Sequence, residues 1–457
     1  MALASVNLNT LYAAFGSSAQ GIDVASAVSQ IINADRVIEQ QWQSQQQTIA
    51  QQTAALNQLS SQTSSLANAL NALQDPLGAL MASQISSTQP SIVTASAVAG
   101  TAAGTHVVDV QNLATTASWY SDAVATADTA FTPGTFDLTV GSGNSQTTTT
   151  IDLGDGINTP NDLVNYINGL NLGVTASAVT DANGVRVALV SNSSGSAGDF
   201  SLQPSGTTSQ NLFTRAATGT NASLTVDGVP ISTATNTVTG VINGVTLNLN
   251  GQAPGTDVVL TIGADTGTAE QAVNAFVTAY NSLVSSLNSQ FAYNAGSQSA
   301  GPLSGDTTVR LLQSSLLAAP SYSTTSGSIA TLRALGITMN DDGTLSVDST
   351  ALEAALQNNS SAVQQFFQGT ASNGFAAGLL TNLNSFTDST DGSFTVDLKS
   401  LSNENNDLQD HINSYEDYLS TVQTNLTNEY NQANITLLQL PQTLKQIQAM
   451  LGNNTSS

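Results

Sequence analysis

Residues 28–73 read VSQIINADRVIEQQWQSQQQTIAQQTAALNQLSSQTSSLANALNAL. Apolar side chains recur every seven residues in two frames set three residues apart, and ten of the fourteen frame positions are apolar. A heptad spacing that persists over this length is typical of coiled-coil helices. Asp75-Pro76 ends the pattern, because the residue before a proline disfavours the helical conformation. We therefore predict one helix over residues 28–75, on the order of 70 Å long at about 1.5 Å per residue.

The C-terminal end carries a similar pattern. Apolar residues from Leu408 to Leu426 alternate steps of four and three, and after an extra step to Tyr430 the spacing resumes. Such an extra step is a stutter, which locally unwinds a supercoil. Pro441 is expected to kink or interrupt this helix near Leu437. A third amphipathic helix is predicted within residues 269–291, with one apolar face made of Ala269, Val273, Phe276, Tyr280, Leu283 and Leu287.

Two interpretations of the terminal heptads remain open: packing of helices within the chain, or assembly between molecules. The length of the predicted rod favours assembly, because little else nearby offers a surface to pack on. The candidate contact residues form what we call the seam: Val28, Ile31, Ile38, Trp42, Ile49, Leu56, Leu59, Leu66, Leu70, Leu73, Leu408, Ile412, Tyr415, Leu419, Val422 and Leu426.

The middle of the chain has a different pattern. Between about residues 116 and 265, short alternating segments are separated by the turn dipeptides Asn183-Gly184, Asp227-Gly228 and Asn243-Gly244. Such dipeptides are typical of β-hairpins. A short helix is expected at residues 161–169. The fold class predicted is therefore α+β and multidomain, with long coiled-coil-type helices at both termini, a mixed helical and hairpin domain, and β-rich inserted domains.

The composition excludes several classes of function. Seven basic residues face thirty-one acidic ones, and the basic residues are scattered, so no basic stripe could neutralise nucleic-acid phosphates or an anionic membrane. Cysteine is absent, which removes thiol catalysis and disulfides. No apolar run approaches the roughly 18 residues needed to cross a bilayer. We expect neither nucleic-acid binding nor membrane insertion.

The densest group of acids lies at residues 335–353, LGITMNDDGTLSVDSTALE. If Gly343 is aligned with the glycine of a calcium-binding EF-hand loop, Thr338 and Ser349 occupy ligand positions that need acids, so a calcium site is rejected. Asp342-Gly343 instead predicts a tight turn. Asp348, Ser349 or Thr350 is expected to cap the following helix, with a capping box between Thr350 and Glu353.

No other group of residues suggests chemistry. His106 and His411 lie in different predicted elements without a spacing partner, so both are interpreted as ordinary surface or hydrogen-bonded histidines. Phosphate-binding glycine loops and nucleophile-elbow motifs are absent from the sequence. We predict no catalytic residue, no cofactor and no metal, and hence a protein that is not an enzyme.

Several stretches resemble the flagellar filament cap family, also called flagellar hook-associated protein 2. They include GIDVASAVSQIINADRVIEQ at 21–40, VVDVQNLATTASWYSDA at 107–123, and the run LRALGITMNDDGTLSVDSTALEAAL at 332–356. Residues 134–141 and 161–191 are similar to the flagellar hook repeat. The order of these stretches along the chain matches the family.

This resemblance implies a division of the chain. Residues 1–75 and 401–457 would form leg helices, 76–115 and 266–400 the two parts of a ring-side domain, and 116–265 the inserted β-rich domains. The seam would then contact neighbouring subunits or the filament. Replacing Leu59 and Leu66 by Asp is expected to break filament attachment and to leave the middle domains folded.

The resemblance also implies a function and partners. A ring of about five subunits would sit at the distal tip of the flagellum, retain exported flagellin and promote its folding and insertion. The protein would be secreted without a cleaved leader through the flagellar type III export apparatus, with an export chaperone, and could contribute to adhesion. The alternatives are another axial flagellar protein, such as a hook–filament junction protein or a flagellin, and a secreted adhesin or carbohydrate-binding protein.

Overall fold

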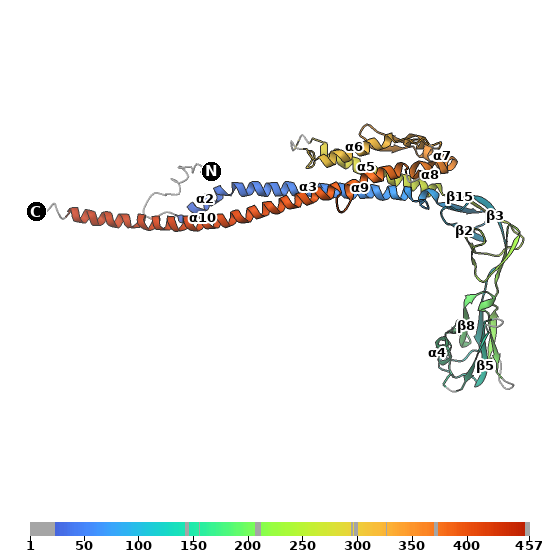
Figure 1. Ribbon diagram of the computed structural model, residues 1–457. Coiled ribbons are helices and arrows are strands. Elements are labelled where there is room, and N and C mark those ends of the chain that lie inside the picture. Colours follow the sequence, from blue (N-terminus) through green and yellow to red (C-terminus); the bar gives the residue numbers. More distant parts are fainter. Residues whose placement is uncertain are drawn as a thin grey trace.

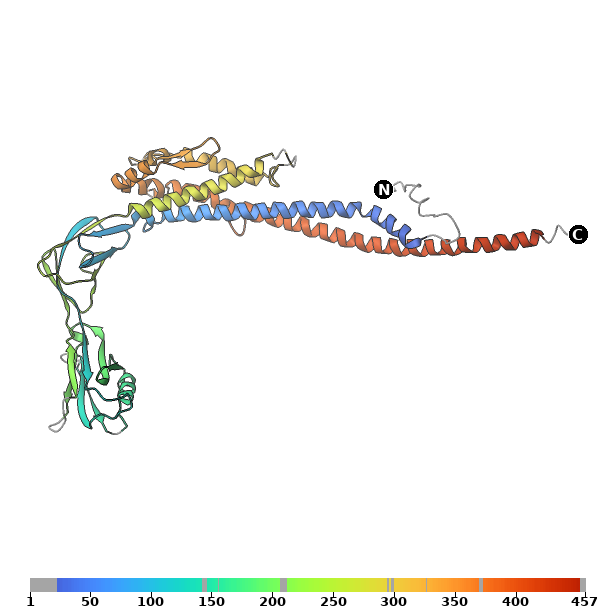
Figure 2. The same ribbon diagram turned by 180° about the vertical axis from the view of Figure 1, so that it is seen from behind.

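The structure, a computed structural model, describes residues 23–452 except for 142–145, 155, 206–211, 294–295, 297–299, 326 and 370–372. It has four parts that follow one another in space along an elongated molecule (Figure 1). A long helical leg leads into a helical domain, and two β domains follow at the far end, turned away from the direction of the leg. The view from behind shows the same order (Figure 2). The first 22 residues of the predicted leg lie outside the described residues.

Three helices build the leg, which we define as residues 24–54 and 402–452. They are α2 (Val24–Asp35), α3 (Val37–Gln74) and α10 (Ser393–Gly452). The single rod predicted over 28–75 is wrong in one respect, because the helix breaks at Arg36. Asp35 occupies a heptad frame position at this break, where a charged side chain cannot support apolar packing. α3 alone has 38 residues, so it is about 57 Å long at about 1.5 Å per residue.

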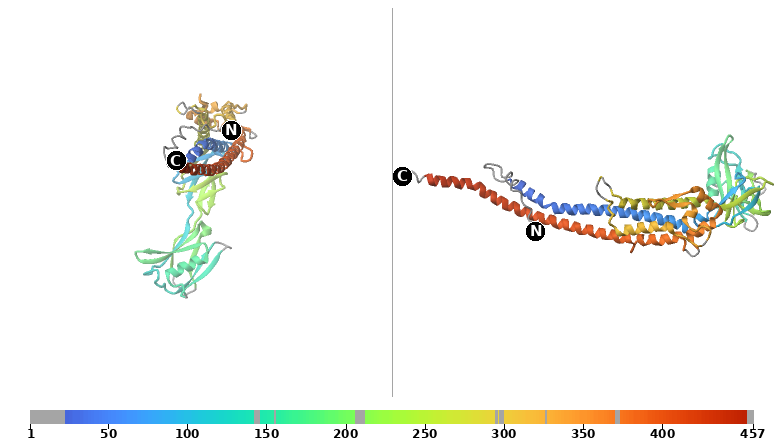
Figure 3. Two further views of the ribbon diagram at one scale, coloured as in Figure 1. Left: turned by 90° about the vertical axis from the view of Figure 1, so that its left-hand side faces the viewer. Right: turned by 90° about the horizontal axis from the view of Figure 1, so that it is seen from above.

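The expected interruption at Pro441 is also wrong. α10 runs as one helix of 60 residues through this position. A proline removes only one backbone hydrogen bond from a helix, and the turns on both sides keep theirs. Seen from above, α10 follows a gentle curve along α2 and α3 (Figure 3).

The helical domain comprises residues 55–82 and 265–401. Its core is built around the upper half of α3 and α5, and all six apolar residues predicted on one face of α5 are buried. The elements of this domain are α5 (Thr266–Phe291), α6 (Thr307–Ala318), α7 (Ser349–Asn358), α8 (Ser360–Gln368), α9 (Phe375–Thr387), the strands β16 (Ile337–Met339) and β17 (Leu345–Val347), and the short helices η1 (Ala79–Met81), η4 (Ala319–Ser321) and η5 (Leu332–Leu335).

Aspartates serve as helix caps in this domain. Asp265, Asp306 and Asp348 each accept a hydrogen bond from the backbone N–H three residues later, which satisfies a donor that the helix itself cannot pair. Of the three candidate caps expected from the sequence, Asp348, Ser349 and Thr350, the structure uses Asp348. The capping box predicted between Thr350 and Glu353 is wrong, because the helix begins at Ser349, two residues earlier than that box requires.

The predicted turn between the two short strands of the helical domain is confirmed. Gly343 has a φ of +83°, and the Asp342 carboxylate accepts a hydrogen bond from the Thr344 backbone N–H at 2.9 Å. The hairpin is held on α5 by Asn281, whose side chain donates to the Leu345 carbonyl at 2.8 Å and accepts from its N–H at 2.6 Å. The acids of this stretch therefore shape a turn and a helix start.

The inner β domain comprises residues 83–114 and 219–264. Two antiparallel sheets enclose an aliphatic core. The five-stranded sheet has the order β1 (Ser83–Ser87), β15 (Val258–Ala264), β3 (Gly104–Asn112), β11 (Ala222–Val226) and β12 (Val229–Thr233), and the three-stranded sheet has the order β13 (Thr237–Thr239), β14 (Val245–Leu249) and β2 (Val93–Ala97).

The strands of residues 83–112 pair with those of residues 222–264. The division predicted from the sequence instead placed 76–115 together with the helical segment 266–400. Local pattern could not reveal this pairing, since the partner strands lie on the other side of an insertion. The predicted Asp227-Gly228 turn is confirmed: Val226 pairs with Val229, and both turn residues have positive φ.

The outer β domain comprises residues 115–218. Helix α4 packs beside its two antiparallel sheets over a core that includes Trp119. The predicted hairpin at Asn183-Gly184 is confirmed, with its turn one residue earlier, because Asp181 pairs with Gly184. The elements are β4 (Thr116–Ser121), β5 (Gly134–Val140), β6 (Thr147–Leu153), α4 (Pro160–Leu170), β7 (Val174–Asp181), β8 (Gly184–Ser194), η3 (Ser196–Gly198), β9 (Phe200–Pro204) and β10 (Phe213–Ala217). The sheet orders are β10-β4-β8-β7 and β6-β5-β9.

Candidate assembly surface

The structure divides the seam into two groups. The upper group lies in the core of the helical domain: Leu56, Leu59, Leu66, Leu70 and Leu73. These side chains are at most 1% exposed, and they pack against the chain's own helices. In this conformation these side chains are not available for contact with another molecule. For this group the structure therefore favours helix packing within the chain over assembly between molecules.

The lower group joins the two ends of the chain. Val28 packs with Val24, Ile32 and Leu419 in a small cluster between α2 and α10. Half-buried seam residues extend this cluster along α10: Tyr415, Val422 and Leu426. The two ends of the chain thus pack against each other in the leg. Val28 and Leu419 are nearly as buried as the upper group, but Tyr415, Val422 and Leu426 are only half-buried and keep surface for a partner.

Polar groups and aromatic rings link α3 to α10 between the two groups. The Trp42 ring stacks on His411 at a centroid distance of 5.8 Å and meets the edge of Tyr415 at 5.5 Å. The Gln46 amide donates to the Gln409 side chain at 3.2 Å. Three further seam residues are buried alongside: Ile49, Leu408 and Ile412. His411 is thus an aromatic partner at the leg, in agreement with its non-catalytic interpretation.

An ion cluster occupies the break between α2 and α3. The Arg36 guanidinium donates to both carboxylate oxygens of Glu416, at 2.5 and 2.9 Å, and to Glu39 at 2.6 Å. The hydrogen bonds from Arg36 hold the pKa of the Glu416 carboxyl below its usual value. The Tyr415 hydroxyl donates to the Asp35 carbonyl at 2.9 Å. The cluster therefore ties the break to α10.

Other apolar side chains of the leg face solvent. Of the seam, Ile38 is 46% exposed, and Ile31 is only half-buried. Leu437, which continues the predicted spacing after Tyr430, is exposed as well. Residues outside the predicted frame are also exposed, and sequence reasoning missed them as surface candidates: Val37, Tyr418, Ile435 and Leu438. The sequence could have indicated these residues, because a hydrophobic residue just outside a heptad frame lies where the paired helix cannot bury it.

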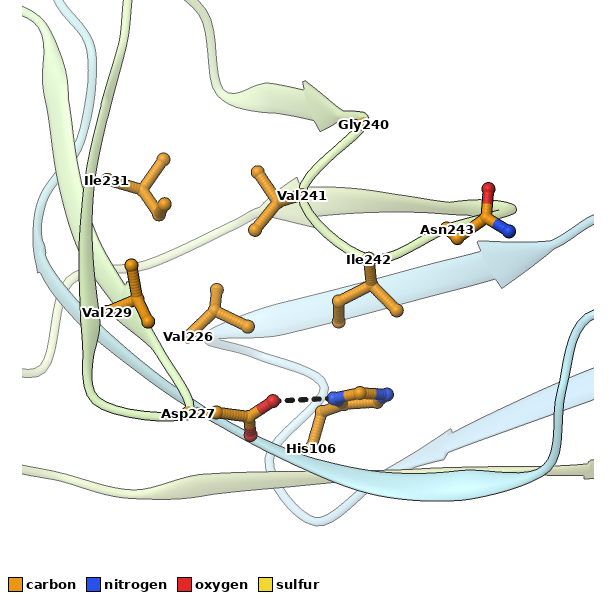
Figure 4. A pocket seen from close by; sticks show the side chains of 9 residues that line it. All are labelled: His106, Val226, Asp227, Val229, Ile231, Gly240, Val241, Ile242 and Asn243. Atoms are coloured by element: carbon orange, nitrogen blue, oxygen red, sulfur yellow. Dashed lines mark hydrogen bonds and ion pairs between the residues drawn. The ribbon is translucent and has the colours of Figure 1, made fainter.

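The β domains contain one pocket that combines an ionisable pair with apolar walls (Figure 4). It has a volume of about 530 Å³ and lies between the β11–β12 turn and residues 240–243. His106 Nδ1 lies 2.7 Å from one oxygen of Asp227, and the other oxygen accepts from the Val107 N–H at 2.9 Å. Both carboxylate oxygens are thus engaged, and aliphatic side chains form the remaining walls. This arrangement fits a structural role of His106.

Within the described part of the chain, no group of three or more histidine, aspartate or glutamate side chains could hold a metal ion. None of its helices is both long and apolar enough to span a bilayer.

Known proteins are similar to this chain over most of its length. The family model described as "Flagellar hook-associated protein 2 N-terminus" matches residues 20–117, and the one described as "Flagellar hook-associated protein 2 C-terminus" matches residues 219–441. The unmatched segment between them corresponds to the outer β domain. It lies between the two matched segments, which build the leg, the helical domain and the inner β domain.

Relatives and a solved structure agree with these matches. The B-type flagellar hook-associated protein 2 of Pseudomonas aeruginosa is 28% identical over 440 residues, covering 90% of this chain and 91% of the relative. Flagellar hook-associated protein 2 of Escherichia coli K12 is 29% identical over 465 residues, covering 96% and 97%. The crystal structure of the D1-D2-D3 domains of the flagellar cap protein FliD from Escherichia coli superposes with a TM-score of 0.61 at 28% identity, covering 76% of this chain and 99% of that one. The resemblance seen in the sequence is confirmed, and the chain belongs to the flagellar hook-associated protein 2 family.

Proposed function

We propose that this protein is the structural cap at the distal end of the bacterial flagellar filament. Its membership in the hook-associated protein 2 family, over nearly the full length of the relatives, is the observation that carries the proposal. The architecture fits the task, since a leg can reach towards the filament while the β domains spread outwards at its other end. The cap would retain exported flagellin and promote its folding and insertion by binding and release, without covalent chemistry.

The proposal extends to assembly and export. Several copies, about five in a closed ring, would place their legs side by side on the filament end. The accessible part of each leg would supply the contacts with neighbours or flagellin: the half-buried residues Tyr415, Val422 and Leu426 and the exposed residues Val37, Ile38 and Tyr418. The chain would leave the cell through the flagellar type III apparatus with an export chaperone. A role in adhesion has no support in the contacts described above.

Deletion of the gene tests the proposal. We expect cells that secrete monomeric flagellin and carry only short stubs in electron micrographs, with filaments restored by the native gene. Full-length filaments in the deletion strain would reject the cap function. The deletion strain also distinguishes a cap from a junction protein. Loss of a cap leaves the hook–filament junction intact, so short stubs remain attached, whereas loss of a junction protein also removes the site where a stub attaches.

A further inference from the structure

Arg36 is the residue at which two helices of the leg meet. α2 ends at Asp35 and α3 starts at Val37, so the guanidinium extends from the break itself. It reaches Glu39 on α3 and both oxygens of Glu416 on α10. One side chain thereby connects α3, α10 and the end of α2. Paired N–H groups on one carboxylate fix direction as well as distance.

α2 depends on α10 for its order. A helix of 12 residues is only marginally stable by itself in water. Its apolar contact with α10 is small. Val24, Val28, Ile32 and Leu419 are its buried residues, and the partly buried side chains around them are Tyr415, Val422, Leu426 and Tyr430. α3 differs, because its upper half is anchored in the core of the helical domain. The leg therefore has a firmly held helix and a weakly held one on the two sides of Arg36.

Few of the described charged side chains of the leg form ion pairs. Only 8% of the chain is charged, and among the side chains that the structure describes in the leg and helical domain, every ion pair includes Arg36. Serines and threonines of these helices mostly bond to carbonyls of their own helix, as Thr48 and Thr421 do. Such bonds do not cross between helices. The Arg36 cluster is thus placed where a bond across helices has the greatest effect on the weakly held segment.

We propose that Arg36 is a latch for a leg joint: bound to Glu39 and Glu416 it holds α2 docked on α10, and its release lets α2 undock as a unit while α3 stays paired with α10. Undocking uncovers Val24, Val28, Ile32 and Leu419. The latch therefore decides whether the lower leg presents a closed helix pair or an open apolar surface. The inference concerns the free chain and does not depend on where the protein works.

Spin labels on the full-length chain test the latch, since the protein has no cysteine and labels attach only where cysteines are introduced. One pair, Ser29→Cys with Gln423→Cys, places exposed labels on α2 and α10. We expect one narrow distance distribution for the native chain by pulsed electron resonance. Arg36→Gln and Glu416→Gln should each add a longer, broad component, with the docked-to-undocked ratio falling on the order of tenfold.

Three controls make the test specific. A second pair, Gln47→Cys with Asn406→Cys, reports on α3 and α10 above the joint and should stay unchanged. Glu429→Gln removes the same charge from an exposed site on α10 and should have no effect. Arg36→Lys keeps the charge but loses the two-pronged contact, so an intermediate ratio is expected. An unchanged α2–α10 distribution in Arg36→Gln and Glu416→Gln would overturn the proposal, and so would equal broadening of both pairs.

Discussion

Two connections in this molecule differ in how they are held. The neck, which we define as residues 113–116 and 217–221 between the two β domains, is tied by many short bonds. Thr115 pairs with Thr220 across the two chain crossings, and the Gly195 N–H donates to the Thr115 carbonyl at 3.0 Å. Asn221 accepts from the Ser196 N–H at 2.8 Å. The joint at Arg36, in contrast, depends on one ion cluster and a small apolar contact.

The difference follows from the chemistry available at each place. At the neck, backbone groups of both domains meet at close range, and glycine makes this approach possible. A Cβ on Gly219 would lie 2.7 Å from the Gly195 carbonyl oxygen, which no side chain tolerates. At the joint, only side chains cross between helices. We therefore expect the β domains to move as one body and the leg to adjust, a contrast that the following changes test.

The largest effect is expected where the leg is anchored. Leu59→Ala and Leu66→Ala should each lower the free energy of unfolding of the helical domain by about 2–5 kcal/mol, because each leaves a cavity in a closed core. Chemical denaturation followed by circular dichroism measures this loss. Leu437→Ala and Leu438→Ala, on exposed side chains of α10, are the matched controls and should change stability by less than about 0.5 kcal/mol.

This prediction replaces the one made from the sequence for the same leucines. Aspartate at Leu59 and Leu66 was expected to detach the leg from the filament and to leave the middle domains folded. Because both side chains are fully buried beside α5, we now expect the helical domain to unfold. A double aspartate variant that keeps the native denaturation curve would show that the upper seam is not a core.

At the neck, Gly195→Ala should be the most damaging single change. Gly195 has a φ of +87°, and an added Cβ would lie 2.7 Å from the Cα of Ala234. We expect a loss of about 2–3 kcal/mol in the stability of the β domains. Gly228→Ala separates the two causes, since its φ is +80° but no atom lies within 4 Å of the added Cβ. Equal losses in the two variants would mean that strain, and not close packing of the domains, explains the effect.

How far the sequence could predict the fold depends on how local each signal is. The Asp227-Gly228 turn and the Asp348 cap come from the chemistry of a few adjacent residues, and both were predicted. The pairing of residues 83–112 with 222–264 depends on contacts across an insertion of over a hundred residues, so no local pattern indicates it. The ion cluster at the break involves Glu416, which is distant in sequence from Arg36. The one local signal for the break was Asp35, a charged residue in a heptad frame position.

The same limit applies to the candidate surface. The heptad spacing includes residues that are buried, such as Leu56 in the helical domain and Leu419 in the leg, but spacing does not say which molecule covers them. Upper residues are covered by α5 and its neighbours, which have their own amphipathic pattern. Whether a half-buried residue such as Val422 contacts another subunit stays a prediction, because a heptad reports burial and not the identity of the partner.

A smaller effect is expected from the side chains that bridge the neck. Asn221→Ala removes an acceptor for the Ser196 N–H and hydroxyl, at 2.8 and 3.1 Å, and a donor to Ser232 at 3.2 Å. The expected loss is about 1–2 kcal/mol in stability. Hydrogen exchange at the Ser196 amide should rise accordingly. Ser232→Ala removes only one of these bonds and serves as the control; exchange as fast in Ser232→Ala as in Asn221→Ala would assign the stiffness of the neck to other groups.

The smallest effect concerns the joint under acid. Arg36 lowers the pKa of Glu416 in the docked leg, so this contribution is complete above the free value of about 4.3 and is lost as the pH falls through the lower, docked value. The label pair on α2 and α10 should therefore report more undocking below about pH 4.3 in the native chain than at neutral pH. Glu416→Gln should lack this part of the response, because the other titratable groups near the joint are present in both chains, Glu39 with its bond to Arg36 included: Asp35, Glu39, His411, Tyr415 and Tyr418. A difference between the two chains that stays constant from pH 7 to about pH 3 would mean that Glu416 does not hold the joint through its charge, and the contrast with the neck would then rest on apolar contacts alone.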